Sequence, residues 1–210
     1  MFPEPSIPMK AAFSDFQRGL EPSRAPVSWG LAAFRGRFAE VSGGEATAAL
    51  TLTMGLVAEA QQCDEPTVWV TGRDSGFYPP DVAAVGIDLS ALAVVWAQGA
   101  LEAARAADLL LRSGAFGLVV LDLGREDDLP LAAQTRLAAL AKKHETALLC
   151  LTRKGRERPS LGSLISLRAD ATRTGRAPPL FRCETLILKD KRQGPGRTYA
   201  ELCHGPDGLS

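Results

Sequence analysis

Residues 38–61 read FAEVSGGEATAALTLTMGLVAEAQ, and this stretch decides the fold. Residues 37–42 (RFAEVS) alternate polar and apolar side chains, a pattern typical of a short strand. Gly43 and Gly44 follow at once and allow a tight turn. From residue 45 to residue 62, alanine, leucine and methionine recur at helical spacing. A strand that passes through a glycine turn into a helix is a unit from which α/β domains are built.

The chain beyond this unit continues to alternate between strand and helix patterns. We expect strands at 67–71, 92–97, 117–123 and 146–152, and helices at 79–85, 99–112 and 129–143. The run at 117–123 (GLVVLDL) is almost entirely apolar, as expected for a strand that is buried on both faces. This order predicts a mostly parallel sheet with helices on both sides.

The last quarter of the chain follows a different pattern. Residues 163–171, 181–189 and 198–204 are predicted strands joined by loops, and they most simply extend the sheet as an antiparallel edge. Residues 1–28 are rich in proline and serine and are interpreted as an N-terminal arm, either flexible or used for docking. With 46% hydrophobic residues in the chain, residues 29–210 are long enough to form one domain.

The charges are unevenly distributed along the chain. Formal net charge is zero, which argues against a strong nucleic-acid or membrane binder. Residues 1–152 hold 12 basic and 18 acidic residues, whereas residues 153–197 hold 12 basic and 4 acidic residues. The basic segment fits an anionic partner, and it equally fits a solvated face whose charges guard edge strands.

The cysteines and the apolar runs indicate the cellular compartment in which the protein is expected. Cys63, Cys150, Cys183 and Cys203 lie far apart without a CxxC pair, so zinc spacing is absent. Cys150 lies in an apolar run and is a predicted core residue. Free cysteines, the absence of a signal-peptide pattern and the lack of a run near ~20 apolar residues predict a cytoplasmic protein. The three tryptophans are predicted core or near-core anchors: Trp29, Trp69 and Trp96.

Several runs, in their order, resemble the core of the RecA recombinase. The stretch at 38–61 is similar to the strand, phosphate loop and helix that open that core. The other runs are VTGRDSGFYPPDVAAVGIDLSAL, AADLLLRSGAFGLVVLDL, SLRADATR, LILKDKR and ELCHGPDGL. Within this lineage the run RSGAFGLVVLDLG and the length of about 200 residues resemble the ImuA family most. The resemblance implies a RecA-like core, and the cell-division inhibitor SulA is a relative with the same fold.

The phosphate loop that this resemblance implies is degenerate. Such a loop uses small residues so that backbone N–H groups can surround phosphate, a lysine for its charge and a Ser or Thr for Mg²⁺. The first glycine, Gly43, remains and is followed by Gly44, but Ala48, Ala49 and Leu50 occupy the positions of the second glycine, the lysine and the hydroxyl. We therefore expect no ATPase activity and no nucleotide cofactor.

Two acids match nucleotide-site positions in the resemblance. Asp122 corresponds to the Walker B aspartate, and Asp74 corresponds to the glutamate that activates the attacking water. Without a phosphate site, both are interpreted as relics or loop residues. No catalytic residue and no metal site are therefore expected. A divergent ATPase that uses Asp74 and Asp122 stays open as an alternative.

Two basic clusters are candidates for binding a partner or DNA. The connection RKGRERPS supplies the first, whereas the acidic connection at 124–129 (GREDDL) would repel DNA. In the second, two lysines resemble those with which RecA reaches the ATP of a neighbouring subunit. The candidates are Arg153, Lys154, Arg156, Arg158, Lys189, Lys191 and Arg192.

The resemblance implies an accessory role in the SOS response to DNA damage. The implied partners are ImuB, the inactive polymerase-like hub, and through it the error-prone polymerase ImuC, with RecA as a further candidate. The protein would then associate with the nucleoid when engaged, without membrane contact. A SulA-like inhibitor that binds the division GTPase FtsZ, and a protein with weak or indirect DNA binding, remain as alternatives.

Overall fold

The computed structural model describes residues 29–45, 47–72, 77–84, 86–125, 128–177 and 180–204, so the predicted arm at 1–28 lies outside the described residues. Within this part of the chain, eight strands form one sheet in the order β3-β2-β4-β5-β1-β6-β7-β8. The first five strands in the sequence are β1 (Phe38–Ser42), β2 (Thr67–Thr71), β3 (Leu92–Trp96), β4 (Leu118–Asp122) and β5 (Ala147–Thr152). All of their pairings are parallel, as predicted.

The C-terminal strands change the direction of the sheet. They are β6 (Leu167–Ala177), β7 (Leu180–Asp190) and β8 (Thr198–His204). β6 still pairs parallel to β1, and only β7 and β8 run antiparallel. The strand predicted from residue 163 begins at Leu167, because Ile165 N–H closes a turn onto the Gly162 carbonyl before Ser166 N–H reaches Phe38.

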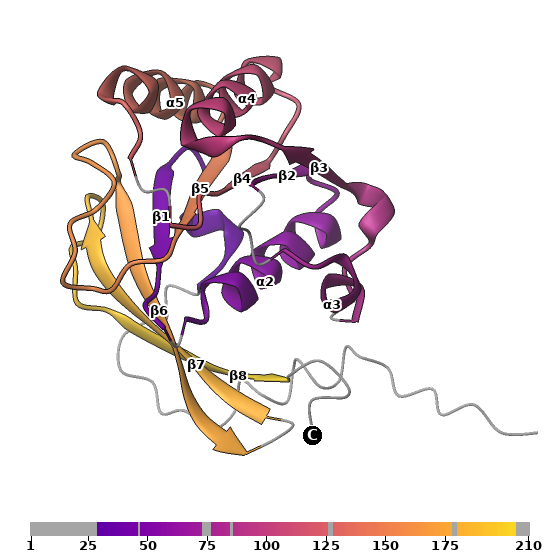
Figure 1. Ribbon diagram of the computed structural model, residues 1–210, viewed down its shortest axis with the longest axis vertical. Helices are drawn as coiled ribbons and strands as arrows, with labels where there is room; N and C mark the ends of the chain where they lie inside the picture. Colours follow the sequence, from indigo (N-terminus) through magenta and orange to yellow (C-terminus); the bar gives the residue numbers. More distant parts are fainter. Residues whose placement is uncertain are drawn as a thin grey trace, which may run out of the picture.

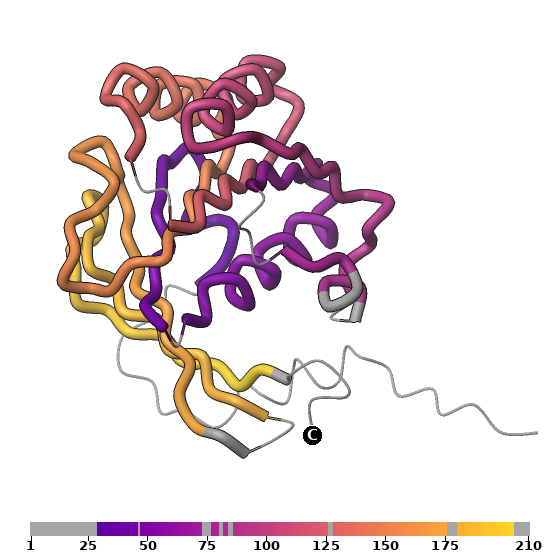
Figure 2. Tube along the Cα trace, in the orientation of Figure 1, coloured from indigo at the N-terminus to yellow at the C-terminus, as the bar shows by residue number. Residues whose placement is uncertain are grey.

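Helices cover both faces of the sheet, as predicted (Figures 1 and 2). On one face lie α2 (Ala49–Gln62) and α3 (Pro79–Ala84), with the 3₁₀ turns η2 (Leu31–Ala33) and η3 (Leu89–Ala91) in the connections. On the other face lie α4 (Gly99–Ser113) and α5 (Leu131–Lys143). No helix in the described ranges combines the length and the apolar character needed to span a membrane.

The sheet separates two hydrophobic cores. Along β4, Val120 packs into the core beneath α2, and Val119 and Leu121 pack into the core beneath α4 and α5. Trp69 and Cys150 are fully buried, which confirms them as core residues. The prediction for Trp96 was wrong, because it ends the edge strand β3 and is 62% exposed.

A mismatch in strand length shapes the carboxyl end of β1. The pairing of β1 with β6 ends at Ser42 and Asp170, whereas β6 continues to Ala177. Residues 171–177 therefore extend past the carboxyl end of β1. This extension lies where the turn after β1 enters α2, as the pairing of Thr47 with Thr172 shows.

Candidate functional site

The carboxyl end of β1 is the position at which a RecA-like domain would hold phosphate. Here the turn bonds to the neighbouring strands. Gly43 N–H donates to the Thr152 carbonyl at 3.3 Å, and Ala48 N–H donates to the Ala171 carbonyl at 3.1 Å. The helix predicted from residue 45 therefore begins only at Ala49, because the preceding backbone pairs with β6.

Thr47 fills the inside of this turn. Its hydroxyl accepts the Ala49 N–H at 3.0 Å, and its backbone forms an isolated antiparallel bridge to Thr172. A Cβ atom at Gly43 would collide with Thr47 Oγ1 and would lie 2.5 Å from the Ala171 carbonyl oxygen. Only glycine fits there. The turn is thus held in place by a side chain and a strand of the protein itself.

The residues that replace the nucleotide-binding groups supply no charge. Ala48 and Ala49 are 1% and 6% exposed and belong to the core beneath α2. Leu50 is half-buried against the same core. Three N–H groups, from Gly43, Ala48 and Ala49, already have protein acceptors, so a phosphate would have to displace those bonds.

The two acids of the resemblance can be placed only in part. Asp122 ends β4 opposite Thr71, is half-buried, and accepts the Gly124 N–H at 3.3 Å. Asp74 lies outside the described residues. Among the described residues, no group of three His, Cys, Asp or Glu side chains is arranged to hold a metal ion.

The first basic cluster lies next to the degenerate turn. A Cβ at Gly44 would lie 4.0 Å from Gly155 Cα, so the two loops touch. The guanidinium-bearing residues Arg153, Arg156 and Arg158 are exposed on this loop. Arg156 also faces the buried carboxylate of Asp170, 3.6 Å away. Burial raises the pKa of Asp170 despite this neighbouring charge.

Lys154 does not belong to that exposed set, contrary to our expectation. Its ammonium is 2.8 Å from Glu40 Oε1, and the exposed fractions of the two side chains are 4% and 0%. Glu40 also accepts the Thr152 hydroxyl at 2.9 Å and the Leu161 N–H at 2.9 Å. Lys154 therefore has a structural role inside the domain, and a partner cannot reach it without breaking a buried ion pair.

Arg168 completes the buried network around Glu40. Its Nε is 3.8 Å from Glu40 Oε2, and it donates to the Arg158 carbonyl and, at 3.1 Å, to the Gly155 carbonyl. β1 and β6 thus hold both ends of the basic loop through buried charges. Sequence reasoning missed Glu40 and Arg168. The sequence did contain a hint, because Glu40 is the one acid in a strand, FAEVS, whose other residues are apolar or small. That this strand lies next to β6 is seen only in the fold.

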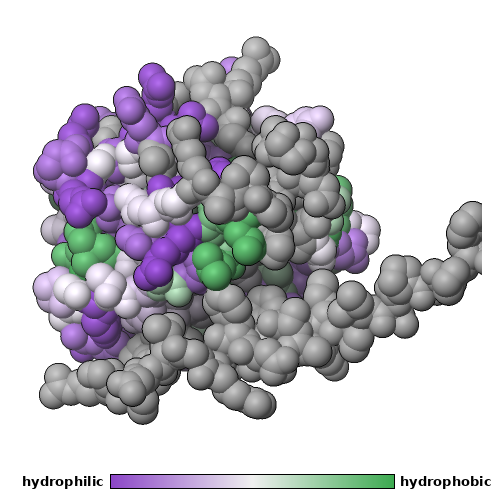
Figure 3. All heavy atoms as spheres, turned by 90° about the horizontal axis from the view of Figure 1, so that it is seen from below, coloured by the Kyte–Doolittle hydropathy of each residue, from purple (hydrophilic) through white to green (hydrophobic). Residues whose placement is uncertain are grey.

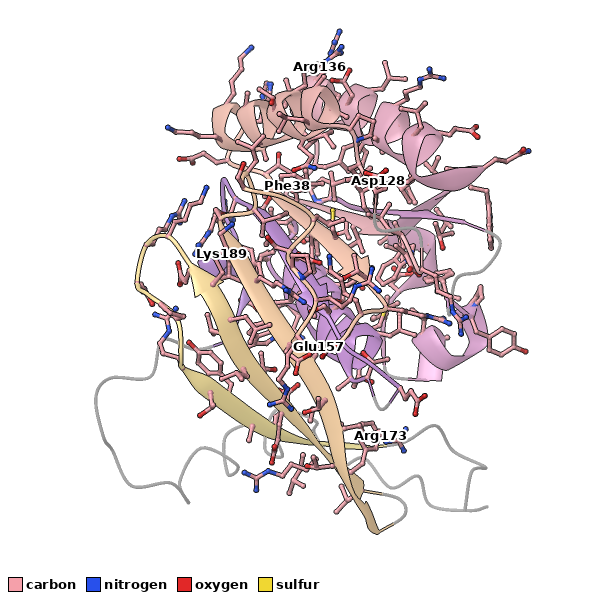
Figure 4. All side chains as sticks on the ribbon, turned by 60° about the vertical axis from the view of Figure 1, so that its left-hand side comes forward. Phe38, Asp128, Arg136, Glu157, Arg173 and Lys189 are labelled. Carbon is pink, nitrogen blue, oxygen red and sulfur yellow. The ribbon has the colours of Figure 1, made fainter. Side chains whose placement is uncertain are left out.

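The second basic cluster lies farther towards the amino end of β1. Figure 4 shows Lys189 between the levels of Phe38, where β1 begins, and Glu157. A register shift in the pairing of β6 with β7 places Lys189 opposite Arg168 and Ile187 opposite Ala169, so one extra residue of β7 bulges. Lys189 therefore lies in one row with Arg168 and with Glu40, the partner of Lys154, whereas Lys191 and Arg192 follow the end of β7.

The lysines of this second cluster bind a loop of the same chain. Lys191 Nζ donates to the Ser163 carbonyl at 2.7 Å, and Lys189 Nζ lies 3.4 Å from the Gly162 and Ser163 carbonyls. Burial, with the nearby charge of Lys191, lowers the pKa of Lys189. Arg192 is exposed and donates to the Arg35 carbonyl at 3.2 Å.

Curated RecA proteins resemble parts of this chain. RecA of Leifsonia xyli subsp. xyli is 30% identical over 130 residues, covering 56% of this chain and 36% of that protein. RecA of Corynebacterium urealyticum is 30% identical over 138 residues, covering 60% and 37%, and RecA of a Nocardioides species is 35% identical over 98 residues, covering 46% and 27%. The chain spans less than two-fifths of the length of these relatives. No family model matches it. Sequence and fold together support a distant RecA-like relationship.

Proposed function

We propose that this chain is a non-catalytic, RecA-like accessory protein of the SOS response. It supports error-prone translesion DNA synthesis by binding ImuB, RecA or both, in the cytoplasm and next to the nucleoid. The main support is the turn after β1, where the N–H groups of Gly43, Ala48 and Ala49 donate to acceptors of the same chain. A fold kept without its phosphate-binding groups favours a role in protein binding.

Charge chemistry supports the non-catalytic part of this proposal. Phosphoryl transfer depends on cations that neutralise charge developing on the phosphate oxygens. The lysine position holds the buried Ala49, and the hydroxyl position holds Leu50. Lys154 is near this end of the sheet, but Glu40 already neutralises it. Millimolar Mg·ATP is therefore expected to raise the melting temperature by less than about 1 °C.

The ImuA-like part of the proposal rests on the sequence runs quoted above and is tested by partner choice. RecA, ImuB and FtsZ would be immobilised separately and exposed to the purified chain at physiological salt. Binding to ImuB or RecA, with no binding to FtsZ, supports the proposal. Binding to FtsZ alone supports a SulA-like inhibitor of division, and no binding to any of the three contradicts the accessory role.

The exposed arginines of the loop after β5 offer a defined variant for the same assay. Arg153→Glu combined with Arg156→Glu reverses charge on the loop that touches the degenerate turn. The matched control is Arg105→Glu, an exposed arginine on α4. If this loop contacts ImuB or RecA, the double variant binds at least about tenfold more weakly and the control binds normally.

A second candidate function, weak DNA binding, is favoured by the same exposed guanidinium groups. Contacts to phosphate would make the affinity for single-stranded DNA fall steeply with salt. The loop carries no aromatic side chain on which bases could stack. Fluorescence anisotropy with a labelled oligonucleotide at two salt concentrations tests this candidate. Tight, salt-insensitive binding would contradict a purely electrostatic contact.

A further inference from the structure

A pocket opens at the amino end of the sheet, away from the degenerate turn. It has a volume of about 310 Å³ and lies between the segment that precedes β1 and strands β6 to β8. This is the lower end of the range for ligand pockets. Seen from below, the described surface carries apolar atoms in separate patches among hydrophilic ones (Figure 3).

The pocket wall has an excess of positive charge. Three arginines line it, Arg37, Arg192 and Arg197, together with one carboxylate, Asp190. Arg37 lies 2.7 Å from Asp190, and Arg197 also pairs with that carboxylate. One acid cannot neutralise three guanidinium groups, so the wall keeps a charge near +2 at neutral pH.

Two enclosed N–H groups of residues at this wall have no acceptor among the residues that the structure describes. They are Trp29 Nε1 and Arg197 Nε. A buried donor without an acceptor costs free energy, and both of these donors are enclosed beneath the pocket surface. A carboxylate supplies acceptor oxygens and the negative charge that the arginines favour.

The rest of the pocket is apolar and partly aromatic. The Trp29 ring centroid is 5.1 Å from that of Phe34 and 6.1 Å from that of Tyr199. Leu167 and Ile187 contribute aliphatic surface from the neighbouring strands. Aromatic rings and arginines are the residues that most often dominate binding energy at protein interfaces. An apolar side chain can be buried here beside a charge.

We propose that this pocket binds a short acidic peptide segment of a partner protein. One apolar side chain of the peptide enters between the aromatic rings and the strands. A neighbouring carboxylate accepts hydrogen bonds from Arg192, which is exposed at the rim. This inference rests on the proposed function, because it takes the ligand to be part of a partner protein. Arg37 and Arg197 already pair with Asp190. This favours the single charge of a peptide carboxylate over the several charges of a nucleotide's phosphates.

The test uses a synthetic peptide and intrinsic tryptophan fluorescence. The probe is the acetylated, amidated hexapeptide GDFLEG, and the control peptide GNFLQG replaces both acids by amides. We expect GDFLEG to change the fluorescence of the folded chain and GNFLQG to bind at least about tenfold more weakly. Equal binding of the two peptides, or no binding of GDFLEG at millimolar concentration, would overturn the proposal.

Two variants locate the binding. Arg192→Glu reverses the exposed charge at the pocket rim, and Tyr199→Ser removes a half-buried ring from β8. Each is expected to weaken GDFLEG at least about fivefold, whereas Arg105→Glu on α4 leaves it unchanged. Unchanged affinity in both pocket variants contradicts the site. Displacement of the peptide by AMP, with inorganic phosphate inactive, would assign the pocket to a nucleotide instead.

The two proposals fail in different ways. If ImuB or RecA binds the chain and Arg192→Glu has no effect on either the partner or the peptide, the pocket inference fails and the accessory role stands. If GDFLEG binds at the pocket and none of RecA, ImuB and FtsZ binds, the accessory role fails and the peptide site stands.

Discussion

The two ends of β1 differ in what their polar groups bind. At the carboxyl end, Gly43, Ala48 and Ala49 give their N–H groups to acceptors of the same chain. At the amino end, Arg37 borders a pocket whose wall includes Trp29, and the enclosed Nε1 of this residue has no acceptor among the described residues. Both ends bond within the chain, since Arg37 also donates to Ser166 and Asp190, but only the amino end borders the pocket to which we assign peptide binding.

This difference shows how a RecA-like fold can lose one site and keep its shape. The sheet needs the turn after β1 only as a connection, so pairing that turn with the extension of β6 satisfies its backbone. The pocket at the other end requires no catalytic geometry. If this pocket binds the proposed peptide, recognition takes place at the amino end of β1, opposite the turn that corresponds to the phosphate loop.

Removing the charge of Glu40, which lies between the two ends of β1, should have the largest effect on stability. Glu40→Gln leaves Lys154 and Arg168 buried without a carboxylate. We expect the free energy of unfolding to fall by roughly 3–5 kcal/mol, measured by urea denaturation. Hydrogen exchange should increase in the loop at 153–162 more than at the amino end of β1.

Glu184→Gln is the matched control, because its partner Arg182 lies on the surface and their side chains are 57% and 46% exposed. Its effect on unfolding should stay below about 0.5 kcal/mol. If the two substitutions cost the same, or if exchange increases equally at both ends, Glu40 does not specifically hold the carboxyl end.

The sequence allowed the alternating α/β fold to be predicted because buried parallel strands appear as short apolar runs, such as 118–122 within GLVVLDL. It did not reveal the spatial order of the strands, so the exposure of Trp96 on the edge strand was missed. The inward turn of Lys154 depends on Glu40, which is more than 100 residues earlier in the chain. Contacts of this range come from tertiary packing, which local patterns do not encode.

Acid should weaken the amino end through Asp190. Burial alone would raise the pKa of this carboxyl, but hydrogen bonds from Arg37, from Arg192 N–H and from Arg197 lower it to about 2. A lowered pKa in the folded state means that Asp190 adds stability above the unfolded value, near pH 4, and that this contribution is lost as pH falls towards 2. The loss should reach about 2 kcal/mol.

The measurement compares the wild type with Asp190→Asn in urea at several pH values from 5 to 2.5. The difference in unfolding free energy between the two proteins should shrink as pH falls, because the wild-type carboxylate takes up a proton. Subtracting the two curves cancels other acids, including Asp170, whose pKa burial raises. A difference that stays constant over this range would show that Asp190 does not titrate as its contacts indicate.

The smallest expected effect comes from opening the carboxyl end at Thr47. Thr47→Ala removes the hydroxyl that accepts the Ala49 N–H, and Thr47→Ser keeps it. By analogy with helix caps, the alanine variant should lose about 1 kcal/mol of stability and the serine variant much less. Neither should gain affinity for Mg·ATP, because Gly43 and Ala48 still donate to carbonyls and Ala49 supplies no cation. Suppose that millimolar Mg·ATP raises the melting temperature of Thr47→Ala but not that of Thr47→Ser or the wild type. The Thr47 hydroxyl would then be what prevents nucleotide binding at the turn after β1, and the missing lysine would not be the cause.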